Sequence, residues 1–272
     1  MNRVFLPRCA DGLRWVYHYT SLRTAMEHIL CEGQLKFSPM ADVKDPRESK
    51  SWSFSVTTEG DESMEDGEFH RLQDEATARL KGTCKLLCMS QDEGEAPNAP
   101  DPWFRRGFAR ARMWAQYGDG HRGVCLVFER EKLHRQIKMT LAPAQIYSGQ
   151  VTYANRAWDD VQAFNLAYSE IRRDTLESLV EAKIAAHYRT YFLTKVEDWA
   201  SEVEWRWVLR GTVLGPEYAP IADALAGIVL GVDVPGVYEP AIWPLAEKYG
   251  APIARISWSN GAPHLAEIGA AR

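Results

Sequence analysis

The sequence is poor in cysteine, lacks a long apolar run and carries no excess of positive charge. Its 272 residues include five cysteines at no framework spacing, which favours a reducing compartment, and we predict a cytoplasmic protein. The longest strongly apolar run, 224–232, is far shorter than the roughly 20 residues of a membrane helix. Residues 1–10 lack a signal-peptide core. The 32 Lys and Arg against 37 Asp and Glu exclude a domain-wide electrostatic footprint for nucleic acid.

The sequence also lacks several motifs that identify enzyme classes. It has no P-loop, no H-E-x-x-H and no G-x-S-x-G. Cys84 and Cys88 are not accompanied by a second Cys/His pair at zinc-like spacing, so we expect both to face the core of a strand. A cysteine hydrolase using His18 or His121 would have no recognisable motif.

The composition, 46% apolar and 25% charged, is that of a globular protein with a sizeable core. Apolar periodicity predicts strands alternating with helices, which favours a mixed α+β fold in a single domain, residues 1–272. We expect a helical block, at about 158–195, to be inserted into this domain. The predicted strands are 15–19, 35–38, 84–90, 123–128, 145–153, 202–209, 228–232 and 253–258. The other predicted helices are 22–33, 69–82 and 238–249.

The first candidate site is the Tyr17-His18-Tyr19-Thr20-Ser21 stretch. It places an imidazole and hydroxyl groups at a strand end, beside the N-terminus of the following helix. Such a position suits the oxygens of a ribose or phosphate. The alternative is a buried histidine bonded to a backbone carbonyl, with Thr20 acting only as a helix cap.

The second candidate site is the glycine-rich stretch from Met113 to Gly123. Trp114 and Tyr117 are three residues apart, so a helical turn would bring both rings to one face, where they could sandwich an aromatic ligand. Asp119, His121 and Arg122 stand among glycines, where a backbone can approach a ligand closely. The alternative is a helix end and turn with both rings in the core.

The third candidate site is the Trp199–Arg206 stretch. In a strand, Glu202, Glu204 and Arg206 share one face. The carboxylates would lie about 7 Å apart, with Arg206 keeping its neighbour ionised. Such a carboxylate can orient a ribose hydroxyl and stabilise positive charge at an anomeric carbon. The alternative is a solvated strand face with cross-strand ion pairs.

Two further segments carry chemistry of lower specificity. The turn Asp45-Pro46-Arg47-Glu48 is polar and could close the same cleft. The Arg105–Arg112 segment interleaves arginines with aromatic residues, a pattern suited to phosphates and stacked bases, although a solvated helical face is the alternative.

These blocks together resemble the bacterial family catalogued as domain of unknown function 2971, over roughly residues 15–232. The family's M-W-x-x-Y-x-D-x-H-x-G-V block matches Met113 to Val124, and its W-x-x-E-x-E-x-R strand matches Trp199 to Arg206. Its Y-x-Y-T/H-Y-T-S-type strand, N-D-P-x-E turn and C-x-S strand match Tyr17-His18-Tyr19-Thr20-Ser21, the turn at 44–48 and Cys88-Met89-Ser90. Lys44 departs from the family's usual asparagine.

The arrangement of an early histidine, a middle serine and a late E-x-E is also similar to the ADP-ribosyltransferase fold, which clamps NAD between two parts of a split mixed sheet. The resemblance implies NAD as substrate, His18 as the ribose anchor and Glu204 as the catalytic carboxylate. Glu202 would orient the acceptor. The remaining implied NAD-cleft residues are Tyr19, Thr20, Ser90, Trp114, Tyr117 and Arg206.

The resemblance therefore implies an NAD-dependent ADP-ribosyltransferase, in the role of a bacterial toxin or phage-defence effector. The Arg105–Arg112 segment would contact a protein or nucleic-acid acceptor. One alternative is an NAD glycohydrolase at the same site. The others are a non-catalytic nucleotide or RNA sensor and a metal-dependent hydrolase using Asp45, Asp119, His121 and a glutamate.

Overall fold

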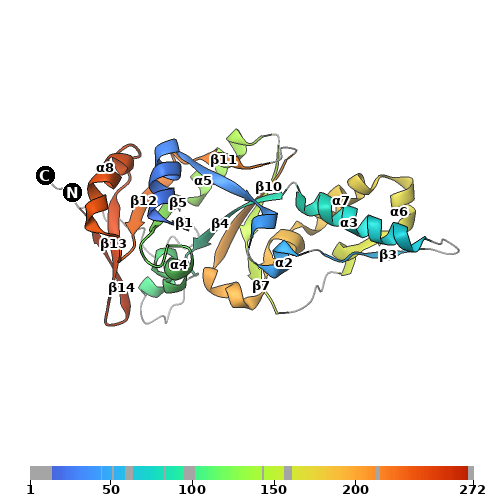
Figure 1. Ribbon diagram of the computed structural model, residues 1–272, viewed down its shortest axis with the longest axis horizontal. Coiled ribbons are helices and arrows are strands. Elements are labelled where there is room, and N and C mark those ends of the chain that lie inside the picture. The colour runs from blue at the N-terminus through green and yellow to red at the C-terminus, as the bar shows by residue number, and fades with distance from the viewer. Residues whose placement is uncertain are drawn as a thin grey trace.

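The computed structural model describes residues 14–43, 45–50, 52–58, 64–82, 84–94, 102–142, 144–155, 161–211 and 215–268. Lys44 and most of the 91–102 loop lie outside these ranges. Within them the chain is a mixed α+β fold around one large, mostly antiparallel sheet (Figure 1). In the same ranges, every helix is too short or too polar to span a bilayer.

The main sheet has the order β11-β2-β4-β1-β5-β12-β13-β14, and β10 joins it by pairing with β4 and β6. Its pairs are antiparallel except β12 with β13. The strands are β1 Trp15–Thr20, β2 Gln34–Pro39, β4 Cys84–Gln91, β5 Val124–Glu129, β6 Gln145–Gln150, β10 Glu204–Arg210, β11 Glu217–Pro220, β12 Leu225–Leu230, β13 Ile253–Ser259 and β14 Ala262–Glu267. Two short parallel pairs lie outside it: β3 Ser55–Thr57 with β8 Asn165–Ala167, and β7 Thr152–Tyr153 with β9 Thr194–Lys195.

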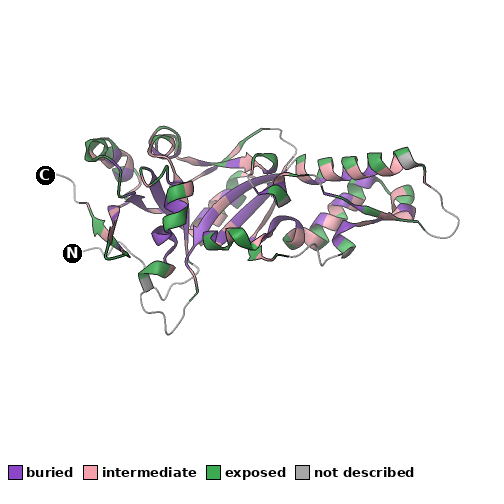
Figure 2. Ribbon diagram, turned by 60° about the horizontal axis from the view of Figure 1, so that its bottom comes forward, coloured by how far each residue is buried: buried purple, intermediate pink, exposed green. Residues whose placement is uncertain are grey.

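Helices cover both faces of the main sheet, and alternate side chains of β5 pack in the cores on its two faces. Leu126 and Phe128 pack in one core with α5, α8 and the π-helix Ala25–Leu30, whereas Cys125 and Val127 pack in another with α4. The predicted burial of this strand on both faces is confirmed. Figure 2 shows the central strands buried and the outer helix faces exposed. The helices are α1 Leu22–Thr24, α2 Pro46–Ser49, α3 Asp66–Gly82, α4 Ala111–Gln116, α5 Arg130–Thr140, α6 Tyr168–Arg173, α7 Leu176–Phe192 and α8 Glu239–Glu247.

A third core forms an arm at one end of the molecule, to the right in Figure 1. The arm contains α3, α6, α7 and the β3–β8 pair, and it packs on β4 and β10 through side chains such as Leu86 and Val208. The helical block predicted at about 158–195 is wrong in part, because its first part contains β8, which pairs with β3 ahead of the two consecutive helices α6 and α7. The pairing partner is about a hundred residues away, so local periodicity could not indicate it.

The main sheet forks at β4, and this fork positions the candidate site. One edge of β4 pairs with β10 along its length, from Cys84 to Ser90. The other edge pairs with β2 around Leu86 and with β1 around Ser90. Between these pairings, residues 87–89 have no strand partner on that edge among the described residues. The sheet is therefore open at the centre of β4.

Candidate functional site

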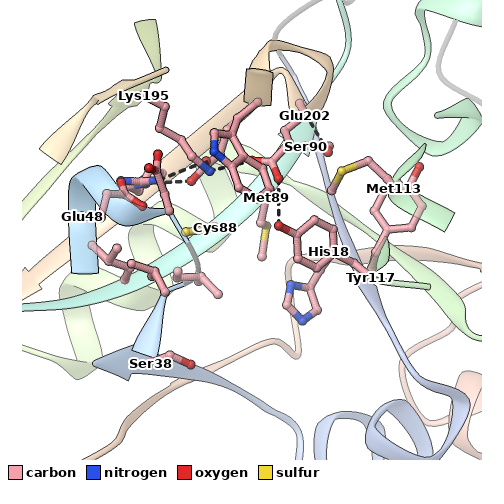
Figure 3. A pocket seen from close by; sticks show the side chains of 18 of the residues that line it. His18, Ser38, Glu48, Cys88, Met89, Ser90, Met113, Tyr117, Lys195 and Glu202 are labelled. Atoms are coloured by element: carbon pink, nitrogen blue, oxygen red, sulfur yellow. Dashed lines mark hydrogen bonds and ion pairs between the residues drawn. The ribbon is translucent and has the colours of Figure 1, made fainter. Parts of the chain in front are cut away.

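A cavity of about 290 Å³ lies at the fork of the sheet (Figure 3). Its lining includes Leu87 and Met89 from one face of β4 and Cys88 and Ser90 from the other, which the missing strand pairing makes possible. The volume is at the lower limit of small-molecule sites. The remaining lining residues are Tyr17, His18, Tyr19, Lys36, Ser38, Asp42, Val43, Asp45, Glu48, Leu86, Met113, Tyr117, Lys195, Trp199, Glu202, Glu204 and Arg206.

His18 reaches the cavity from β1, at the point where β1 leaves β4. Burial lowers the pKa of its imidazole to about 4, and a hydrogen bond to the backbone of Cys88 offsets only part of that effect. The imidazole is therefore neutral at pH 7. Tyr19 also lines the cavity, and its hydroxyl donates to the carbonyl of Gly107. Thr20 does not line it, and Ser21 rather than Thr20 caps the following helix.

The structure separates the two aromatic candidates of the glycine-rich stretch. Tyr117 lines the cavity, and its hydroxyl donates a 2.8 Å hydrogen bond to Glu202 Oε1. Trp114 lies in the core instead, with no exposed surface. Its Nε1 donates to the carbonyl of Phe108 at 2.7 Å, and its ring packs edge-on against Tyr19. Trp114 is therefore not available to stack on a ligand, whereas Tyr117, at the C-cap of α4, reaches the cavity.

The turn after Tyr117 has a structural role. Asp119 and His121 adopt positive φ angles of 51° and 70°, and Gly123 donates to the Gly118 carbonyl at 2.8 Å. A Cβ at Gly123 would lie 2.2 Å from the Thr20 carbonyl oxygen, so only glycine fits there. The spacing Gly118-x-Gly120-x-x-Gly123 matches a dinucleotide fingerprint, but it follows a helix and precedes a strand, the reverse of that motif's context.

Glu202 and Glu204 come together in a way that the predicted strand does not describe. The strand begins at Glu204, and Glu202 ends the 3-10 helix Glu197–Glu202, so a single strand face over 202–206 is wrong. Val203 between them has a left-handed conformation, φ 43° and ψ 62°, which is strained for a β-branched residue. Ser90 supports this turn by donating to the Glu202 carbonyl at 2.8 Å. Strained backbone held by its surroundings is typical of functional sites.

Lys195 and Arg206 hold the two carboxylates. Lys195 Nζ lies 2.7 Å from Glu202 Oε2 and 3.1 Å from Glu204 Oε2. Arg206 donates two bonds to Glu204, of 2.7 and 3.0 Å, and also contacts Glu48 and the carbonyl of Phe192. These contacts lie in the lining of the cavity, and the five charged side chains are all buried there. The interpretation as a solvated strand face is therefore wrong.

The pKa values follow from burial opposed by these partners. Burial alone would raise the pKa of Glu204, but Arg206 and Lys195 lower it to about 2. Burial raises the pKa of Glu48, and Arg206 offsets that only in part. The pKa of Lys195 is raised because Glu204 and Glu202 outweigh its own desolvation. Three carboxylates against two cations leave one formal negative charge, so the cluster suits a positively charged group.

Cys88 lines the cavity without the properties of a nucleophile. Burial, and then the nearby Glu204 carboxylate, raise the pKa of its thiol well above the usual value. The thiol is therefore protonated at pH 7, which argues against the cysteine-hydrolase interpretation.

The sequence did not single out four polar residues of the cavity. They stand in no motif, and only the fold brings them to the fork: Lys195, Lys36, Ser38 and Asp42. The polar turn was expected to contribute, and Asp45 and Glu48 do line the cavity. A lone lysine between a long helix and a tryptophan offers no sequence pattern that could have indicated Lys195.

The arginines of the Arg105–Arg112 segment mostly serve internal contacts. Arg106 is buried beside Asp92, at 3.2 Å, and Arg110 is buried beside Glu93, at 3.0 Å. These two side chains are not available to phosphates. Arg112 is exposed, but it donates to the Asp198 carbonyl at 2.8 Å.

The residues suggested for a metal-dependent hydrolase are not gathered in one place. Asp45 lines the cavity, whereas Asp119 and His121 stand in the turn after α4 and do not. Within the described ranges, no group of three or more His, Cys, Asp or Glu side chains is arranged to hold a metal ion. The metal interpretation therefore has no support from geometry.

Comparison with known proteins gives one match. The family model described as protein of unknown function (DUF2971) matches residues 113–207, which confirms the resemblance to that family over this part of the chain. The matched stretch runs from the cavity-lining Met113 through Lys195, Glu202, Glu204 and Arg206. No curated protein and no solved structure matches the chain.

Proposed function

We propose that the chain is an NAD-consuming enzyme with an ADP-ribosyltransferase-like fold, which breaks the nicotinamide–ribose bond and transfers ADP-ribose to a macromolecular acceptor. The observation that carries this proposal is the meeting of His18, Tyr117 and the Glu202–Glu204 pair around one cavity. These side chains come from distant parts of the chain, and the fork of the sheet brings them together.

The acidic cluster supplies the main chemical requirement of the reaction. Breaking the glycosidic bond builds positive charge on the ribose, so a fixed anion beside the sugar lowers the barrier. Glu204 fits this role because Arg206 and Lys195 keep it ionised and fixed in place. Glu202, held by Tyr117 and Lys195, would orient the acceptor. An acceptor nucleophile attacks the anomeric carbon and loses its proton, and nicotinamide leaves with the bonding electron pair.

The neighbouring groups have roles that match their chemistry. A neutral His18, whose N–H bonds to the Cys88 backbone, can accept a hydrogen bond from a ribose hydroxyl through its other ring nitrogen without opposing the positive charge of the reacting sugar. The Tyr117 ring can stack on the nicotinamide. Ser90 holds the turn that carries Glu202. In the Arg105–Arg112 segment, two arginines are buried and cannot contact an acceptor. The exposed Trp103 and Phe104, directly before that segment, are therefore the candidate contacts.

The test is release of nicotinamide from NAD by the purified protein, with and without candidate proteins and nucleic acids. Transfer of adenine-labelled material to a macromolecule supports the transferase, and a role as a toxin or in phage defence would then be tested through that acceptor. Release with free ADP-ribose as the product supports a glycohydrolase. Thermal stabilisation by NAD without release would indicate a sensor and contradict the enzyme.

A further inference from the structure

We propose that Lys195 is a positioning residue, whose ammonium group holds Glu202 and Glu204 side by side as two ionised carboxylates. Its effect on catalysis rests on the proposed function, whereas the pairing itself does not. The Lys195 ammonium lies between the two carboxylates and contacts both of them. Lys195 follows α7, the long helix of the arm, so the assignment extends the site to the end of that arm.

The geometry around the Lys195 ammonium supports this assignment. Nζ contacts Glu202 at 2.7 Å and Glu204 at 3.1 Å, and it lies 4.9 Å from the centre of the Trp199 ring. The side chain is 7% exposed. A lysine has three donors and no acceptor, so two carboxylates and an aromatic face are a suitable environment for it.

Among the described residues, no other cation pairs with Glu202 in this way. Arg206 is committed to Glu204, Glu48 and the Phe192 carbonyl, and Tyr117 is a neutral donor to Glu202. Among the residues that the structure describes, Lys195 is the cation that pairs with the Glu202 carboxylate. The ion-pair partner of the Glu202 carboxylate is therefore one ammonium group, which Glu204 shares.

The backbone fixes where this ammonium lies. Lys195 ends β9, directly after α7 and Leu193, and β9 pairs with β7 at Thr152 and Tyr153. The Tyr153 hydroxyl in turn accepts from the Glu204 backbone N–H at 2.9 Å. The lysine, its strand and one of its carboxylates therefore form one connected unit, which also links α7 of the arm to the acidic pair.

Removing the ammonium should leave two buried carboxylates with insufficient compensation. Like charges this close do not both remain ionised, so one carboxylate of the pair should take up a proton at a pH well above its usual range. A residue that only filled space would have no such effect on titration. This difference separates positioning from packing.

The experiment compares K195M, K195R, E202Q and the double variant K195M/E202Q by thermal unfolding between pH 5 and 8. In the parent, the Glu204 pKa of about 2 lies below the usual 4.5, so its contribution to stability is constant above about pH 5 and is lost only at lower pH. In K195M the carboxylate pair should have a folded-state pKa above 4.5. The K195M protein should therefore become more stable as the pH falls. The gap in Tm between parent and K195M should therefore narrow from pH 8 to pH 5.

K195R should restore most of the lost stability, and the double variant should be more stable than K195M because it removes one of the two negative charges. The double variant also serves if K195M alone does not fold. K85M is the matched control, because Lys85 is a buried lysine paired with Glu217 outside the cavity. We expect K85M to lower Tm without changing nicotinamide release.

The activity measurement uses the same variants. In K195M the acid limb of the pH profile for nicotinamide release should move up by about 1 to 3 units. A Tm gap that is constant with pH, or a double variant no more stable than K195M, would overturn the proposal even if the parent releases nicotinamide. A K195M variant more active than the parent would also overturn it. If the parent releases no nicotinamide but the Tm pattern holds, the proposed function fails and the pairing stands.

Discussion

The hydroxyl of Tyr117 lies 2.8 Å from Glu202 Oε1 and donates a hydrogen bond to it across the cavity (Figure 3). This bond joins the end of α4 to the turn before β10, two segments separated by more than eighty residues. Tyr117 therefore has two separable properties, a ring that faces the cavity and a hydroxyl that orients a carboxylate.

Two substitutions at Tyr117 should separate these properties. Y117F keeps the ring, so NAD affinity should stay close to that of the parent while transfer to the acceptor falls, because Glu202 loses its orienting donor. Y117A also removes the ring and should weaken NAD binding by about 1 to 3 kcal/mol, the usual effect of losing a stacking partner. Calorimetric titration with NAD checks both. Equal NAD affinity in Y117A and the parent would show that the ring does not contact the substrate.

Lys36 should contact the diphosphate of the substrate. Lys195 and Arg206 are engaged by carboxylates, whereas Lys36 is an exposed cavity-lining cation with no ion pair among the described residues. Lys36 and Ser38 are two residues apart on β2, so they share one face of the strand, and both line the cavity. K36A should raise KM for NAD about tenfold, equal to about 1.4 kcal/mol, and leave kcat unchanged.

The control for the Lys36 substitution compares two ligands that differ in the diphosphate. ADP-ribose carries the diphosphate and nicotinamide riboside does not, so K36A should weaken binding of the first and spare the second. The affinity of the parent for ADP-ribose should also fall with salt. Equal losses for both ligands would mean that Lys36 acts on the shape of the cavity and not on phosphate.

His18 should make the folded state sensitive to mild acid. Burial lowers its pKa to about 4 from the usual 6.5, so below pH 6.5 the unfolded chain takes up a proton that the folded chain does not. Stability should fall by roughly 3 kcal/mol between pH 6.5 and 4 from this residue alone. H18Q should lose less stability over that range, measured by urea unfolding. H28Q is the control, because His28 is exposed and lies outside the cavity lining.

Local patterns in the sequence were sufficient for most of the central strands. The continuous apolar run before Phe128 predicted β5, whose residues are buried on both faces of the sheet. The alternation around Trp207 predicted most of β10, where Trp207 packs in one core and Val208 in another. The strand β8 was missed because its pairing with β3 is a long-range contact. The helix α5 was missed because its sequence is mostly polar, with Leu133 and Ile137 as its buried residues.

The candidate site was predictable where a motif carried it and unpredictable where only the fold did. The stretch around Glu204 and the stretch around His18 were both identified, and the structure brings them to one cavity. Trp114 was misplaced because its spacing from Tyr117 does not show that its ring is covered by Tyr19 and its Nε1 bonded to the Phe108 carbonyl. Lys195 was missed because its role arises from the β7–β9 pairing, which leaves no mark on the surrounding sequence.

The most direct test of the account is a comparison of E204Q with the parent in two measurements, NAD affinity by calorimetry and nicotinamide release by chromatography. The glutamine keeps the shape of the side chain and removes the anion that would stabilise the reacting ribose. We expect NAD to bind E204Q about as tightly as the parent, while nicotinamide release falls by on the order of 10²–10³-fold. An E204Q variant that binds NAD and releases nicotinamide at nearly the parent's rate would contradict the account.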